Sequence, residues 1–351
     1  MKNTYMDIVR KINNLYYPNK TARVLPAVVM VEPTNMCNLR CSMCYVQQRS
    51  TGIKHYLSVR QFKDIVEQFQ KIRELIFCGI GEPLLNADIF EMIKLARHKG
   101  AAFINLITNG KLLNKDTALR VVASGIDRIQ ISVHSFNPEV FAKVRNENQS
   151  NLENLIENIR YLIELRNKMN AGLKISCNVV ITKFNYDDML KLLKYAKELK
   201  IDKVEFIQLT TAYGALSDIN APFGQMPRII REIRRVACKL NIKVGFLSGN
   251  ECGRCYQLWD FVMVHADGNI SPCNGIFPTE NVGVGNIFLN PLQEIWNSKK
   301  YQDLRSLVSE GKLQNCKFCE SGYCLEGKDF RWFKNYYLRP IKRLIKHSLL
   351  K

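Results

Sequence analysis

Six short apolar segments alternate with amphipathic helical patterns between residues 27 and 210, and this alternation limits the folds open to the chain. The expected strands are 28–32, 74–79, 103–108, 128–133, 174–181 and 203–209. The expected helices are 58–71, 86–98, 114–124, 151–168 and 187–198. Strands separated by helical crossovers pair in parallel, because each helix returns the chain to the same end of the sheet. The sequence therefore predicts an α/β protein with a parallel sheet.

Three cysteines, Cys37, Cys41 and Cys44, follow the first expected strand in a CxxxCxxC array. The loop that leaves the carboxyl end of a strand is where α/β barrels and sheets place their chemistry. Thiolates select iron–sulfur clusters and zinc over magnesium or calcium. Three thiols can hold three irons of a 4Fe-4S cluster and leave the fourth iron open, whereas a structural zinc site usually takes four ligands from paired CxxC units.

This array resembles the signature of the radical S-adenosylmethionine (radical SAM) enzymes. In that family the methionine amino and carboxylate groups of SAM chelate the open iron, and an electron from the cluster cleaves SAM to a 5′-deoxyadenosyl radical. The resemblance implies that Cys37, Cys41 and Cys44 act in catalysis as ligands of the SAM-binding cluster. It also implies a partial (β/α)6 TIM-like barrel, which the expected alternation of strands and helices matches.

Two segments after the second and third expected strands resemble SAM-binding motifs of this family. Gly81, Glu82 and Pro83 resemble the GGEP motif, whose backbone meets the SAM amino group, although an isoleucine replaces the first of its paired glycines. Thr108 and Asn109 end the third strand in the same manner, and Asn109 also begins an Asn-Gly turn signal.

The fourth strand leads into a segment that resembles the family's "Ser-x-Asp … Arg" pattern. Ser132 and Arg145 would contact the SAM ribose and carboxylate, and a planar guanidinium suits a carboxylate. His134 replaces the usual acid and is either a proton donor or acceptor near the substrate or a satisfied structural residue. Asn178 on the fifth strand is a further expected SAM contact, and Glu205 on the sixth is expected to face either substrate or solvent.

A second group of six cysteines lies between residues 252 and 324. Between its members, Asp267-Gly268 predicts the turn of a β-hairpin, and Asn290 is the expected N-cap of a helix with Pro291 at its first position. This arrangement strongly resembles the SPASM/twitch extension of radical SAM enzymes, which carries one or two auxiliary 4Fe-4S clusters.

The SPASM/twitch resemblance implies one auxiliary 4Fe-4S cluster. The alternative is that a second, incompletely ligated cluster is also present. The expected ligands are Cys255, Cys273, Cys316 and Cys319, with Cys252 and Cys324 as alternatives. A rival grouping of Cys252, Cys255 and Cys273 resembles the three-thiol site in the radical enzyme of molybdenum-cofactor biosynthesis. A zinc ribbon is the alternative outside this family.

Three further cysteines, Cys78, Cys177 and Cys238, are expected to pack in the core, because free cysteine is among the most buried residue types. Cys238 lies in a basic helix expected over 228–240.

The chain is expected to have four parts, namely an N-terminal helical arm (1–26), the partial barrel (27–245), the SPASM/twitch domain (246–327) and a basic amphipathic tail (328–351). The arm is shorter than the leader-binding domain of many peptide-modifying radical enzymes. The tail holds eight basic residues and one acidic residue, so it either lies on an anionic membrane surface or docks on its own protein.

The 351 residues carry a formal net charge of +19, which favours anionic partners. Nucleic acid is not an expected partner, since no nucleic-acid module accompanies the charge. A signal peptide and a long apolar span are both missing from the sequence, which predicts a cytoplasmic protein, with peripheral membrane contact through the tail as an alternative.

The resemblance implies a radical SAM enzyme of oxidoreductase or epimerase type that takes electrons from a donor such as flavodoxin or ferredoxin. The expected substrate is a small polar metabolite such as a sugar, aminocyclitol or nucleotide-linked sugar. The alternative is a peptide or protein side chain that undergoes oxidation or crosslinking. A hypothesis of another class is a zinc-bearing scaffold that binds membrane or RNA.

Overall fold

A single curved sheet organises the protein. The computed structural model describes residues 20–22, 24–44, 53–209, 226–247, 257–273 and 283–309. Within these residues nine strands pair in the order β7-β6-β5-β4-β3-β2-β1-β8-β9. The strands are β1 (Val28–Val31), β2 (Glu74–Phe77), β3 (Ile104–Thr108), β4 (Arg128–Ser132), β5 (Lys174–Ile181), β6 (Lys203–Gln208), β7 (Lys243–Leu247), β8 (Phe261–Val264) and β9 (Ile270–Ser271). Neighbouring strands run parallel from β7 through β8, and the β8–β9 pair is antiparallel.

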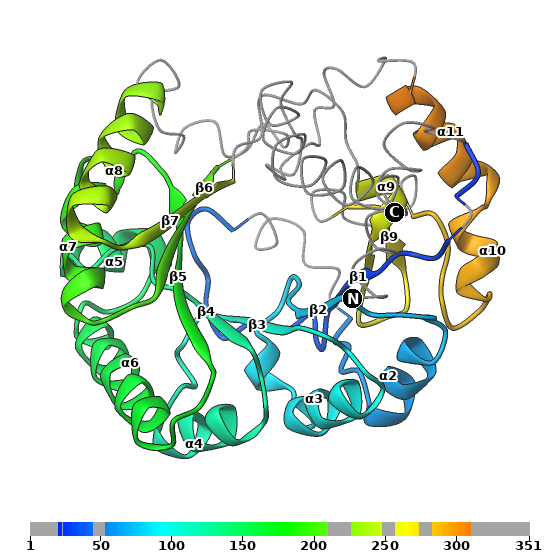
Figure 1. Cartoon of the computed structure of the whole chain (residues 1–351), viewed down its shortest axis with the longest axis horizontal. Coiled ribbons are helices and arrows are strands. Elements are labelled where there is room, and N and C mark those ends of the chain that lie inside the picture. Colours follow the sequence, from blue (N-terminus) through cyan, green and yellow to red (C-terminus); the bar gives the residue numbers. More distant parts are fainter. Residues whose placement is uncertain are drawn as a thin grey trace, which may run out of the picture.

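Helices line the outer side of this sheet, and Figure 1 shows α2, α3, α4, α6 and α7 along the curve. The helices are α2 (Val59–Val66), α3 (Ile89–His98), α4 (Lys115–Ala123), α5 (Pro138–Arg145), α6 (Ser150–Lys168), α7 (Met189–Glu198), α8 (Met226–Leu240), α9 (Gln257–Asp260), α10 (Leu292–Trp296) and α11 (Lys299–Ser309). Local sequence explains several helix starts. Ser58 and Gln61 form a capping box at α2, and the Asn137 side chain caps α5 ahead of Pro138.

The two faces of the sheet carry different side chains, because successive residues of a strand point to opposite sides. Ile104 and Leu106 of β3 belong to the main hydrophobic core under the helices, whereas Asn105 between them faces the inner side. A second, small apolar cluster lies on that inner side, on β1, β2 and β8. Its buried members are Met30, Ile76, Phe261 and Met263. The inner face is therefore apolar near β1 and polar further along the sheet.

The predicted parallel α/β fold is confirmed, and the six expected strands are present with small shifts in their ends. The sequence reading missed α5 and β7. The start of α5 carries a clear signal in Asn137-Pro138. β7 is only five residues long and has Gly245 at its centre, and a central glycine weakens a strand pattern.

The predicted hairpin is present as β8 and β9, and Gly268 lies in its turn with φ +84°. The sequence did not predict that β8 also pairs with a strand of the main sheet. β8 runs parallel to β1, with Val28 opposite Phe261 and Val31 opposite Val264. All four residues of β8 are buried, so the strand is apolar on both faces, as in a buried parallel sheet. The hairpin thereby extends the main sheet.

The C-terminal helices are joined to the segment that leads into β1. The Trp296 indole N–H donates to the Val24 carbonyl at 3.0 Å, and the Ala22 N–H donates to the Asn297 side chain at 2.9 Å. The expected cap of α10 needs a correction, since Pro291 rather than Asn290 is the N-cap residue and the helix begins at Leu292.

The expectation of core packing holds for two of the three remaining cysteines. Cys177 is fully buried in the main core, and Cys78 packs against the inner apolar cluster. Cys238 is exposed on α8, so its expected burial was wrong, because the apolar face of this helix turns other residues toward the sheet.

Several predictions fall outside the described residues. These are most of the N-terminal arm, the basic tail and the cysteines Cys252, Cys255, Cys316, Cys319 and Cys324. In the described part of the chain, the helices are all too short or too polar to span a membrane.

Candidate active site

The loop after β1 brings three thiols together at the carboxyl edge of the sheet. Cys37 is exposed, and Cys41 and Cys44 are half-buried. Burial raises the pKa of Cys41 to about 12, the Arg145 guanidinium opposes this shift, and the charges of Cys44 and Cys37 add to it. Burial likewise raises the pKa of Cys37, with Cys44 among the contributing charges. The three sulfur atoms are therefore close enough to interact.

The chemistry of this donor set fits a 4Fe-4S cluster. Three thiols on one loop can hold three irons, and iron supplies the positive charge that lets buried thiols ionise. Among the described residues, no three Cys, His, Asp or Glu side chains, these cysteines included, are close enough to hold one metal ion, whereas each thiol ligand of a cluster binds a different iron. We propose that Cys37, Cys41 and Cys44 are the cluster ligands.

Contacts with three other segments hold the cysteine loop in place. The Asn109 side chain donates to Asn38 Oδ1 at 2.8 Å and lies 3.9 Å from Cys37 Sγ. On the other side of the loop, the Ser42 N–H donates to the Val144 carbonyl at 2.9 Å. The cysteine loop is thus held by the end of β3 and by α5. The segment after β2 also contacts it.

Glu82 braces the ends of β2 and β3 from a buried position. Its carboxylate accepts hydrogen bonds from Thr108 Oγ1 at 2.6 Å, from the Asn109 N–H at 2.7 Å and from the Leu84 N–H at 3.1 Å. Burial raises the pKa of Glu82, and these hydrogen bonds oppose the rise. The carboxylate therefore fixes the position of Asn109, which contacts the cysteine loop.

Gly81 allows the segment after β2 to approach the cysteine loop. A Cβ at this position would lie 2.2 Å from the Thr34 carbonyl oxygen and 2.4 Å from that of Met36. Both are backbone atoms that cannot rotate away. Gly81, which was expected to bind SAM, thus allows close packing against the cysteine loop. Pro83, another expected SAM contact, begins a short 3-10 turn, η2 (Pro83–Leu85).

Arg145 is buried at the end of α5 and joins three elements. Its Nη1 donates to the Asn109 carbonyl at 2.8 Å and to the Ser132 carbonyl at 2.6 Å, and its Nε donates to Glu147 at 2.8 Å. Within the described residues Nη2 donates no hydrogen bond. That nitrogen is the part of the guanidinium that could meet the SAM carboxylate.

The surroundings of His134 favour its structural role. The residue is buried with a left-handed backbone, φ +65°, and its Nδ1 accepts a hydrogen bond from the Val180 N–H at 3.2 Å. Burial, assisted by the Arg145 charge, lowers the pKa of His134 to about 3. The ring is therefore neutral, and the nitrogen that remains for proton exchange with a substrate is Nε2.

A row of amides crosses the inner face of the sheet. Asn105 Nδ2 donates to Gln130 at 2.6 Å, and Gln130 Nε2 donates to Asn178 Oδ1 at 2.9 Å. Because the Asn178 oxygen meets Gln130, the Asn178 NH₂ group is left to donate elsewhere. Asn178 pairs in register with Glu205 on β6. A donor and an acceptor are thus neighbours on the inner side.

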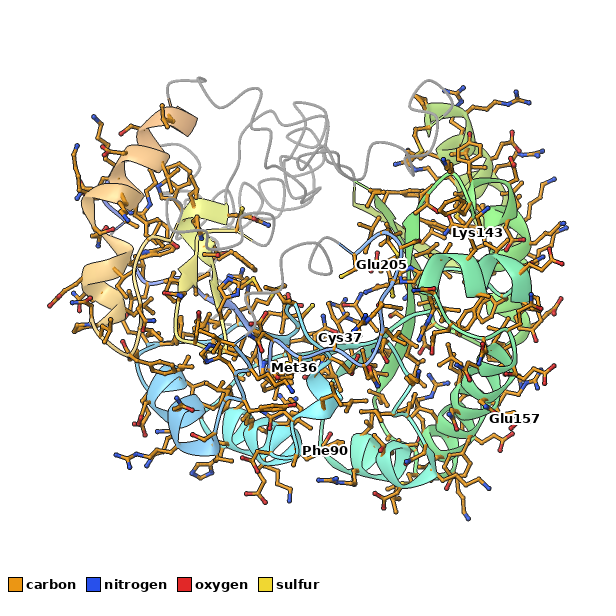
Figure 2. All side chains as sticks on the ribbon, turned by 180° about the vertical axis from the view of Figure 1, so that it is seen from behind. Met36, Cys37, Phe90, Lys143, Glu157 and Glu205 are labelled. Atoms are coloured by element: carbon orange, nitrogen blue, oxygen red, sulfur yellow. The ribbon has the colours of Figure 1, made fainter. Side chains whose placement is uncertain are left out.

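Glu205 lies in a notch made by Gly245 on β7. A Cβ on Gly245 would fall within 1.8 Å of a Glu205 carboxylate oxygen, and Lys203 forms an ion pair with the same carboxylate. Figure 2 shows Glu205 and Cys37 both on the inner side of the curve, whereas Glu157 lies on the outer rim. The sequence predicted a site role for Glu205 but not the space that Gly245 leaves for its carboxylate.

A buried pair at the junction of β1 and β8 was also missed. Glu32 Oε2 accepts from the Ile80 N–H at 2.6 Å and lies 3.7 Å from His265 Nδ1. His265 Nε2 is 2.8 Å from Ser271 Oγ. A signal was available, since Glu32 is a charged residue that directly follows an apolar strand. These contacts connect the start of the cysteine loop to the hairpin.

Two family models match separate parts of the chain. Residues 31–196 match the family model of the radical SAM superfamily. Residues 255–321 match the model of SPASM, an iron-sulfur cluster-binding domain. The first match contains the expected SAM-binding residues, and the second contains the later cysteines except Cys252 and Cys324.

Two curated relatives resemble most of the chain. The tungsten-containing aldehyde ferredoxin oxidoreductase cofactor-modifying protein of Pyrococcus furiosus is 24% identical over 315 residues, which are 82% of this chain and 86% of that protein. The PqqA peptide cyclase of Streptomyces rochei is 25% identical over 289 residues, which are 78% of this chain and 76% of the cyclase.

A solved structure shares the fold. Streptococcus suis SuiB bound to precursor peptide SuiA superposes with a TM-score of 0.69 at 17% sequence identity, and the match covers 91% of this chain and 75% of SuiB. The chain therefore belongs to the radical SAM superfamily and carries a C-terminal SPASM domain, and its cofactors are a SAM-binding 4Fe-4S cluster, SAM and auxiliary iron–sulfur.

Proposed function

We propose that this radical SAM enzyme modifies a side chain of a peptide or protein by oxidation or crosslinking. The observation that carries this proposal is the donor–acceptor pair Asn178 and Glu205, which lies on the same inner side as the cysteine loop. A peptide offers a complementary N–H and C=O at every residue, so it can bind both partners of such a pair.

Two comparisons support the peptide reading over the small-metabolite reading. PqqA peptide cyclase is named for a peptide substrate, and SuiB was crystallised with a precursor peptide. The Pyrococcus furiosus relative is named for modifying a cofactor, and this observation makes a non-peptide cofactor the second candidate.

The bound cluster and SAM supply a 5′-deoxyadenosyl radical that removes a hydrogen atom from the substrate. In this proposal the protein positions the reactants. Arg145 Nη2 meets the SAM carboxylate, and Ser132, Asn109 and the backbone around Gly81 and Glu82 line the SAM site. Glu205 and Asn178 hold the substrate on the inner face, so here Asn178 binds substrate rather than SAM.

Anaerobic turnover with candidate substrates tests the proposal. The reconstituted protein is reduced with dithionite and incubated with SAM and synthetic peptides encoded by short reading frames beside its gene. We expect 5′-deoxyadenosine together with a peptide whose mass falls through loss of hydrogen. Modification of a metabolite fraction, with every peptide unchanged, would favour the second candidate. No 5′-deoxyadenosine under any condition, as expected for a Cys41→Ala control, would contradict the assigned chemistry.

A substitution at Glu205 tests the substrate contact separately. Glu205→Gln keeps the size of the side chain but replaces one acceptor oxygen with a donor. We expect peptide modification to fall at least tenfold while 5′-deoxyadenosine formation without peptide is unchanged. Glu157→Gln, on the exposed face of α6, is the matched control and should behave as wild type. Normal peptide modification by Glu205→Gln would remove Glu205 from the substrate site.

A further inference from the structure

A buried carboxylate joins the start of the cysteine loop to the segment after β2. Glu32 follows β1 directly and is 2% exposed. Its Oε2 accepts a hydrogen bond from the Ile80 N–H at 2.6 Å, and its Oε1 accepts one from the Ala266 N–H at 3.3 Å. A Cβ on Gly79 would lie 2.4 Å from Oε2 of Glu32, so the carboxylate occupies space that this glycine leaves. The carboxylate is thus fixed between the end of β2 and the hairpin.

The hairpin holds Glu32 through a histidine between its two strands. His265 Nδ1 lies 3.7 Å from Glu32 Oε2, and His265 Nε2 lies 2.8 Å from Ser271 Oγ on β9. His265 and Ser271 are 2% and 1% exposed. The Glu32 N–H also donates to the Val264 carbonyl of β8 at 2.9 Å. Moving any of these groups would leave a buried polar atom without its partner, so the contacts keep the carboxylate in place.

The hydrogen bond to Ile80 places Glu32 against the proposed SAM site. Ile80 comes just before the residues whose backbone is expected to meet the SAM amino group. Two residues further on, the Glu82 N–H donates to the Met36 carbonyl at 2.8 Å, directly before Cys37. The backbone from Ile80 to Glu82 is therefore held by Glu32 at one end and by the cysteine loop at the other.

We propose that Glu32 and His265 are positioning residues of the SAM site, which hold the backbone from Ile80 to Glu82 in the orientation that binds SAM. Backbone groups that are oriented before the ligand arrives bind it more tightly, because binding then orders fewer groups. Glu32 belongs to the cysteine loop and His265 to the hairpin, so the C-terminal hairpin contributes to SAM affinity through this contact. The role rests on the proposed SAM site and is independent of the identity of the substrate.

The affinity of the reduced holoenzyme for SAM tests the role of Glu32. Glu32→Gln keeps the size of the side chain but has one acceptor oxygen instead of two, so either the Ile80 or the Ala266 N–H loses its partner. SAM titration followed by electron paramagnetic resonance should give a Kd about tenfold higher, as expected when a hydrogen bond to a charged group is lost. Iron content should match wild type, and saturating SAM should restore 5′-deoxyadenosine formation. Glu74→Gln, which alters a carboxylate paired with Arg128 at the other end of β2, is the matched control and should bind SAM like wild type.

A variant of His265 tests the contribution of the hairpin. His265→Phe keeps a planar ring but removes both nitrogens, and it should raise the Kd for SAM in the same direction. The effects of Glu32→Gln and His265→Phe should be less than additive in the double variant, because both act through one carboxylate. Wild-type affinity for SAM in either single variant overturns the role of that residue. Loss of the SAM cluster, measured as missing iron, also overturns the proposal, since positioning residues leave ligation intact. If the wild-type signal itself does not respond to SAM, the proposed SAM site fails instead.

Discussion

The charged side chains at the carboxyl edge of the barrel are largely occupied by protein partners. Glu82 accepts three hydrogen bonds, and Arg145 donates to two backbone carbonyls and to Glu147. Such groups stiffen the site, because removing one of them leaves several buried partners unpaired. The sequence motifs predict Glu82 and Arg145 as SAM contacts. The structure shows that both side chains also hold protein segments together, which the motifs do not reveal.

His134 should make the stability of the folded protein depend on pH. Its pKa is about 3 in the folded state and 6.5 in a model peptide, so the unfolded chain binds the proton first as pH falls. Stability is full above pH 6.5 and declines toward pH 3, by about 2 kcal/mol at pH 5. We expect His134→Asn to flatten this decline between pH 7 and 5 in denaturant titrations, because asparagine tolerates the left-handed backbone.

The matched control for this prediction is His98→Asn. His98 is exposed in the last turn of α3, and its replacement should leave the decline unchanged. An equally steep decline in His134→Asn would show that other groups cause it.

At the scale of elements, loops after successive parallel strands converge because parallel strands place their carboxyl ends on the same edge. The cysteine loop after β1 contacts the segment after β2, and Asn109 at the end of β3 contacts both. The approach between the first two segments is so close that it requires Gly81, where a Cβ would meet backbone oxygens. Side-chain rotation cannot relieve such a contact.

Gly81→Ala should disrupt the cysteine loop while sparing the rest of the protein. The added methyl group must displace the backbone at Thr34 and Met36, just before Cys37. We expect anaerobic reconstitution to yield about four fewer irons per chain and little 5′-deoxyadenosine, because one 4Fe-4S cluster is lost. The auxiliary cluster should remain detectable by electron paramagnetic resonance.

Gly172→Ala is the control for added volume, since a Cβ at Gly172 meets nothing within 4 Å. It should reconstitute like wild type. Full iron content and full 5′-deoxyadenosine formation in Gly81→Ala would show that the loop can move aside.

At the scale of the whole molecule, the C-terminal part is built onto the first strands of the barrel. β8 pairs with β1, the Trp296 indole bonds to Val24, and Gln68 accepts a hydrogen bond from the Leu292 N–H at 2.7 Å. The contacts bring residues more than 200 positions apart in sequence into one sheet and one core. The cysteine loop after β1 and the hairpin that leads to Cys273 are thus both attached to β1.

The ion pair between Arg73 and Asp260 should contribute to this attachment. Arg73 Nη2 lies 2.5 Å from Asp260 Oδ2, and the side chains are 28% and 23% exposed. In a double-mutant cycle with Arg73→Gln and Asp260→Asn, we expect a coupling of about 1 kcal/mol in the free energy of unfolding. The exposed pair Lys299–Asp303 is the control and should couple more weakly. A coupling near zero between Arg73 and Asp260 would mean that this contact adds nothing to the attachment.

The sequence by itself determined the chemistry and the order of the elements. Cysteine spacing indicated iron–sulfur binding, and the alternation of apolar and amphipathic segments predicted the six strands and their helices. These features are local, because propensity, periodicity and thiol spacing act over a few residues. The ligand roles of the cysteines remain predictions on the same basis.

The tertiary structure decided which distant residues meet. It placed β8 beside β1, set Glu32 against His265 and aligned Asn178 with Glu205. Register between strands and packing between distant helices follow from the burial of whole faces, and local sequence does not encode the partner. Elements and their chemistry are therefore read from the sequence, whereas the neighbours that tune that chemistry come from the fold.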